Sequence, residues 1–88
     1  IRKLNFYRTG ITIKAIKTLA KSKVLKKVKH LNLGRNYLHP DSAKVLAATK
    51  TLVNVETLLM IENYLGDEGV RNIMESESFE KLKTFRVL

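Results

Sequence analysis

Apolar residues return at fixed positions every 27 residues along the chain, and their spacing changes within each 27-residue unit. Near the start of a unit two apolar residues stand two apart, as Leu31 and Leu33 do, which is the alternation of a half-buried strand. Later in the unit, apolar residues occupy positions 16, 19 and 25, which follow helical spacing. Each unit therefore predicts a strand, a turn, a helix and a loop, in that order.

The units are residues 1–27, 28–54 and 55–81, with a partial fourth unit at 82–88. Seven positions are apolar in every unit that contains them, with no insertion or deletion. A helix that connects two strands makes those strands parallel, with a right-handed crossover, and stacked units of this kind form a curved solenoid. The sequence therefore predicts one α/β domain over residues 1–88, with a concave parallel sheet and helices on the convex side.

A polar residue follows each predicted strand at position 9 of the unit, where Thr9, Asn36 and Asn63 stand. A short amide side chain can bond to main-chain groups within a tight turn, so we assign Asn36 and Asn63 a structural role. Thr12 is predicted to cap the first helix, and Pro40 is predicted to lie in the first turn of the second.

The stretch LNLGRNYL, Leu31–Leu38, has the form L-x-L-x-x-N-x-L and returns as LLMIENYL at Leu58–Leu65. This pattern resembles the ribonuclease-inhibitor-like class of leucine-rich repeat proteins, and the resemblance covers essentially the whole chain. It implies a short horseshoe of about 3.3 repeats that binds another protein through the concave strands and adjoining turns. No polar capping unit is recognised at either end, which favours a piece of a longer array or self-association through the open ends.

The chain has no cysteine and no N-x-[ST] sequon, and these absences favour an intracellular, cytoplasmic setting. No apolar run approaches the ~20 residues that cross a bilayer, so no membrane span is expected. The net charge of +9 is unevenly distributed: the first unit carries +9, the second +3, the third −5 and the tail +2. This gradient favours an acidic protein partner for the basic end of the stack.

The outward positions of the predicted strands and turns form the candidate partner-binding face. Leu59 and Ile61 are apolar on this face, and they are either anchors for a protein partner or scattered surface hydrophobes. The complete predicted set is Tyr7, Arg8, His30, Asn32, Arg35, Leu59, Ile61, Glu62 and Arg86.

Lys14, Lys17 and Lys21 stand three and four residues apart and share one face of the first predicted helix. They form either a solvated face or a basic patch that binds nucleic acid or another anionic surface. The nucleic-acid alternative is the weaker one, because only Tyr7 is expected nearby for base stacking. A purely structural segment of a larger solenoid is the third alternative.

Catalysis is not expected in this chain. The two histidines, His30 and His39, are predicted to lie apart, and Glu62 is the one acid expected on the concave side. No phosphate-binding loop, nucleophile elbow or metalloprotease motif occurs. The sequence therefore predicts a non-catalytic protein-interaction scaffold that needs no metal or cofactor.

Overall fold

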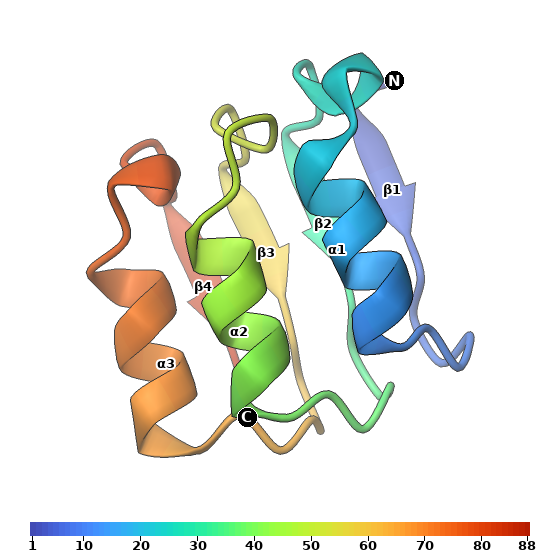
Figure 1. Cartoon of the computed structure of the whole chain (residues 1–88), viewed down its shortest axis with the longest axis vertical. Coiled ribbons are helices and arrows are strands. Elements are labelled where there is room, and N and C mark those ends of the chain that lie inside the picture. Colours follow the sequence, from blue (N-terminus) through green and yellow to red (C-terminus); the bar gives the residue numbers. More distant parts are fainter.

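The computed structural model describes residues 1–88 and has two layers, a sheet on one side and helices on the other (Figure 1). The sheet holds four parallel strands in chain order, which are β1 (Lys3–Asn5), β2 (His30–Asn32), β3 (Thr57–Leu59) and β4 (Thr84–Arg86). The helices are α1 (Ile13–Lys21), α2 (Pro40–Ala47) and α3 (Gly66–Met74). The predicted α/β class and the parallel sheet are confirmed.

Strand pairing follows the 27-residue spacing of the sequence. Leu4 pairs with Leu31, Leu31 with Leu58, and Leu58 with Phe85. Each connection passes through a helix, so the three helices lie side by side over one face of the sheet (Figure 1). Residues 27 apart therefore become neighbours in space, and the face of the sheet without helices, here called the open face, remains accessible.

The core lies between the sheet and the helices. Leu31 and Leu58 enter it from the strands, and Ile16, Leu46 and Ile73 enter it from the three helices, each with at most 1% of its surface exposed. No buried side-chain nitrogen or oxygen lacks a hydrogen-bond partner. The core is thus a continuous apolar layer to which every helix contributes.

Position 25 of the unit does not belong to the helices. Leu25 and Phe79 lie in separate 3-10 helices, η1 (Lys23–Leu25) and η2 (Glu77–Phe79), and Leu52 lies in a loop. The helical spacing predicted for this position is wrong, because the chain leaves the α-helix and turns before the residue returns to the core. A short 3-10 turn is a common form of connector after an α-helix.

Of the two residues predicted to begin helices, Pro40 takes the predicted place and Thr12 does not cap its helix. Thr12 precedes α1 in an extended conformation, but its side chain makes no capping hydrogen bond. Pro40 begins α2 as predicted, where its missing N–H would have had no partner within the helix.

Hydroxyl groups tie the loops after α2 and α3 to the preceding unit. Thr49 and Thr51 are buried, and both donate to the carbonyl oxygen of Ala20, at 2.8 and 3.0 Å. One unit later, Ser76 occupies the position equivalent to Thr49 and donates to the carbonyl oxygen of Ala47. These bonds satisfy carbonyls that the ends of α1 and α2 leave free, and they hold adjacent units in register.

Candidate binding surface

The side chain of Asn36 joins the turns of the first two units. Only 5% of its surface is exposed, and its amide group makes five hydrogen bonds to the main chain. Its Oδ1 accepts from the N–H groups of Thr9 and Gly10, at 3.0 and 2.9 Å. Its Nδ2 donates to the carbonyl oxygens of Phe6, Leu33 and Gly34.

Asn63 repeats this arrangement one unit later. Its Oδ1 accepts from the N–H groups of Asn36 and Leu38, at 3.0 and 2.9 Å. Its Nδ2 donates to the carbonyl oxygens of Leu33 and Met60. The two asparagines therefore hold the turns after β1, β2 and β3 together, in contacts made only with main-chain groups.

The backbone of these turns adopts the left-handed conformation at residues that are not glycine. Arg8, Arg35 and Glu62, at position 8 of each unit, have φ of 53°, 55° and 58°, and Tyr37 has φ of 57°. This conformation costs a residue with a Cβ atom about 1 kcal/mol or more. We use the name turn edge for the surface formed by these four residues and Tyr64.

An ion pair joins the second and third units at the turn edge. The guanidinium of Arg35 contacts both carboxylate oxygens of Glu62, through Nε to Oε2 and through Nη2 to Oε1 at 3.2 Å. The hydrogen bond from Arg35 lowers the pKa of Glu62, and the reciprocal bond raises the pKa of Arg35. Both groups face solvent, so the pair contributes more to the placement of the side chains than to stability.

This pair predicts an acid-sensitive contribution to stability. Because the pKa of Glu62 is lower in the folded chain than in the unfolded chain, the contribution is present above the unfolded value of about 4.3 and is lost as the pH falls through the folded value. Glu62→Gln should therefore lower the melting temperature at pH 6, by an amount that shrinks as the pH falls below the unfolded pKa of Glu62. Glu80→Gln, at a carboxylate without an ion pair, is the control. A Glu62→Gln deficit that persisted unchanged at pH 3 would contradict the assignment.

Three aromatic rings stack beside this ion pair. The ring centroids of Tyr37 and Tyr64 are 5.9 Å apart with an interplanar angle of 20°, and those of His39 and Tyr64 are 5.7 Å apart at 25°. Tyr37 is 71% exposed and Tyr64 57% exposed. The sequence analysis missed this cluster, although two tyrosines at the same position of successive units were its signal.

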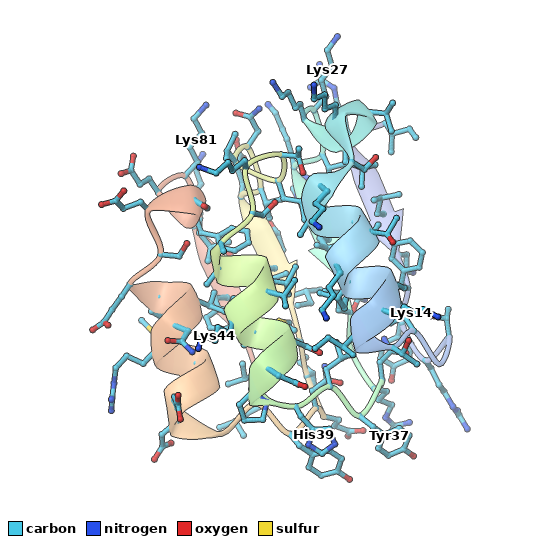
Figure 2. The ribbon with its side chains drawn as sticks, viewed as in Figure 1. Lys14, Lys27, Tyr37, His39, Lys44 and Lys81 are labelled. Carbon is cyan, nitrogen blue, oxygen red and sulfur yellow. The ribbon has the colours of Figure 1, made fainter.

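A groove of about 680 Å³ runs along the turn edge. Figure 2 shows Tyr37 and His39 at the lower edge of the view, at the opposite end of the molecule from Lys27 and Lys81. The groove is lined by Arg8, Gly10, Arg35, Tyr37, Glu62, Asn63 and Tyr64. Of the predicted binding residues, the structure thus brings Arg8, Arg35 and Glu62 together here.

The open face carries the other predicted residues, and its apolar side chains are only partly exposed. Leu59 and Ile61 are both half-buried. Tyr7 is exposed and its ring covers Gly34, where an added Cβ would lie 2.9 Å from Tyr7 Cδ1. Along the remaining strand positions, His30 and Asn32 are half-buried and Arg86 is exposed.

The lysines of α1 form a separate surface. Lys14, Lys17 and Lys21 are all exposed, and none of them forms an ion pair within the chain. None of the three lines the turn-edge groove. The basic patch and the aromatic groove are therefore two distinct candidate surfaces.

The structure shows neither a cluster of metal ligands nor a helix suited to a bilayer. No group of three or more histidine, cysteine, aspartate or glutamate residues is placed to hold a metal ion. None of the helices combines the length and apolar character needed to cross a bilayer. When the chain is compared with protein-family models, curated proteins and solved structures, none of the three comparisons finds a match.

Proposed function

We propose that this chain is a non-catalytic protein-binding module of the leucine-rich repeat kind, which contacts its partner through the turn edge and the open face. Support for a repeat solenoid comes from features that return from unit to unit. These are the 27-residue strand register, the bonds of Asn36 and Asn63, and the hydroxyl bonds of Thr49 and Ser76. Each feature joins a unit to its neighbour, as stacking requires.

The strained turn edge is the observation that carries the proposal. Four residues with positive φ lie on one edge of the molecule, and three of them are arginine or tyrosine. Glycine would occupy these backbone positions without strain, so fold stability alone does not account for the residues found there. Arginine and tyrosine are the residue types that dominate the energetics of protein interfaces.

Charge favours an acidic partner. On the strand side, Glu56 is already paired with Lys29 and Lys83, at 3.9 and 3.7 Å, and Glu62 with Arg35. In contrast, the exposed cations Lys3, Arg8 and Arg86 form no ion pair within the chain. A partner with carboxylates would therefore meet uncompensated positive charge along this side.

The open face alone is too small for a stable interface, so the turn edge has to contribute to partner binding. Four strands about 4.8 Å apart, with about four outward residues each, present on the order of 200 Å². A standard interface buries about 800 Å² on each partner. A stable complex therefore has to extend from the open face over the turns.

The experiment is affinity capture with quantitative mass spectrometry, using the wild-type chain and two variants. Leu59→Asp combined with Ile61→Asp alters the open face, and Arg35→Gly alters the turn edge without adding backbone strain. Both variants should lose proteins that the wild-type chain retains, whereas Lys44→Gln on α2 should keep them. Retention of every captured protein by both variants would refute binding through these surfaces.

A second candidate function follows from the exposed, unpaired lysines of α1. The basic patch would bind nucleic acid or an anionic membrane surface electrostatically, and the affinity would fall steeply with salt. Changing Lys14, Lys17 and Lys21 to glutamate should abolish such binding. Binding that is indifferent to salt would exclude this candidate.

A further inference from the structure

Side chains at the turn edge are matched between the second and third units. At position 8, Arg35 pairs with Glu62 across the two units. At position 10, Tyr37 stacks on Tyr64. At positions 8 and 10 of these two units, each charge and each ring therefore has a neighbour of complementary chemistry 27 residues away.

The first unit contributes neither an ion pair at position 8 nor a ring at position 10. Its position 8 is Arg8, which is exposed and forms no ion pair, and its position 10 is Gly10, which has no side chain. A Cβ added at Gly10 would meet no atom within 4 Å, so the space beside Tyr37 is open. Tyr37 stacks on one other ring only, that of Tyr64, which leaves the second face of its own ring free.

We propose that a protein partner fills this gap with an aromatic residue next to an aspartate or glutamate, an inference that rests on the proposed protein-binding function. The aromatic ring lies over Gly10 and extends the stack on Tyr37, and the carboxylate binds the guanidinium of Arg8. Offset stacking suits two flat rings, and a guanidinium and a carboxylate form a charge-assisted pair. The partner thus supplies the ring and the anion that the first unit lacks.

The charges in the groove favour a peptide over a single-stranded nucleic acid. In this groove the guanidinium of Arg35 is already paired with Glu62, so a phosphate backbone that follows the row of rings would meet only one free cation. The nearby acid Asp41 does not line this groove but lines a second hollow of about 410 Å³, which shares Gly10 and Tyr37 with the groove and lacks Arg8. Arg8 is consequently the one uncompensated charge in the groove, which matches a single carboxylate better than a run of phosphates.

The left-handed backbone allows variants that alter the groove and keep the fold. Arg8→Gly and Tyr37→Gly place glycine at φ of 53° and 57°, where it is the least strained residue. Gly10→Tyr fills the gap with a ring, at a cost in backbone strain because φ is 77° at this position. Thermal melting of each variant establishes that it remains folded before binding is measured.

The experiment selects ligands for the wild-type chain from a library of random short peptides and measures their affinities for each variant. The expected ligands contain a tryptophan, tyrosine or phenylalanine beside an acidic residue. Arg8→Gly, Tyr37→Gly and Gly10→Tyr should each weaken their binding about tenfold or more, whereas Lys44→Gln should change it less than about twofold.

Three outcomes overturn the proposal, and they are distinguishable. Selected peptides that bind the three variants as tightly as the wild-type chain would exclude the groove and leave the open-face function standing. A selection that yields no wild-type ligand would exclude the groove as a peptide site, and affinity capture with the Leu59→Asp, Ile61→Asp variant would decide the proposed function separately. Binding of oligothymidylate that is lost in Arg8→Gly and Tyr37→Gly, without any selected peptide, would assign the groove to nucleic acid.

Discussion

Asn36→Ala is expected to lower the free energy of unfolding by about 3 kcal/mol, measured by chemical denaturation. The substitution removes five hydrogen bonds at once, and it leaves the carbonyl oxygens of Phe6, Leu33 and Gly34 without this donor. Because Asn36 is only 5% exposed, water cannot replace its amide without rearrangement of the turn. The two turns that it joins lie in different units, so the loss also weakens the boundary between those units.

Two further variants separate this effect from a general cost of losing an asparagine. Asn5→Ala removes one exposed bond, to the N–H of Tyr7, and should cost no more than about 1 kcal/mol. Asn36→Asp keeps the acceptor for Thr9 and Gly10 but sets a carboxylate oxygen against three carbonyl oxygens in a nearly buried site, so at neutral pH it should cost at least as much as Asn36→Ala. An Asn36→Ala chain as stable as Asn5→Ala would mean that the turn does not depend on the amide.

Leu58→Ala is expected to cost about 3 to 5 kcal/mol in the free energy of unfolding. Leu58 is 0% exposed and lies in β3, where it pairs with Leu31 on one side and Phe85 on the other. Truncation of the side chain leaves a cavity in the middle of the core, where the paired strands on both sides limit collapse of the structure. A change of this size is a large share of the stability of a small domain, so much of the Leu58→Ala chain should be unfolded on warming.

The neighbouring residue provides a matched control. Leu59 has the same side chain on the same strand but points to the open face, where it is half-buried. Leu59→Ala should therefore cost no more than about 1.5 kcal/mol. A reversed order of the two effects would mean that the strand presents its other face to the core, which is the result of a one-residue shift in register.

The repeat in the sequence predicted the strands and their pairing because burial alternates within a strand and returns with each unit. Leu31 and Leu58 could be assigned to equivalent strands from their spacing alone, and the structure pairs them directly. The structural role of the turn asparagines could be predicted for a similar reason, because a polar residue between apolar ones has few roles in a tight turn.

The groove could not be predicted in the same way. Arg35 and Glu62, like Tyr37 and Tyr64, are 27 residues apart in the sequence, but their contacts also depend on the left-handed backbone that orients three of these four side chains. Spacing indicates which residues lie in neighbouring units, whereas side-chain direction comes from backbone angles that no hydrophobic pattern encodes. The 3-10 turn at Leu25 was missed because an apolar residue four positions after a helix suits either a longer helix or a turn.

The principal contacts between helices and between strands join neighbours in chain order, so each unit depends on the unit beside it. The boundary between the first and second units can therefore open while the contacts among the later units remain. Arg8 and Gly10 belong to the first unit and Tyr37 to the second, so a ligand held among them would span that boundary. Such a ligand would act as a staple, and occupancy of the groove would suppress separation of the first unit from the second.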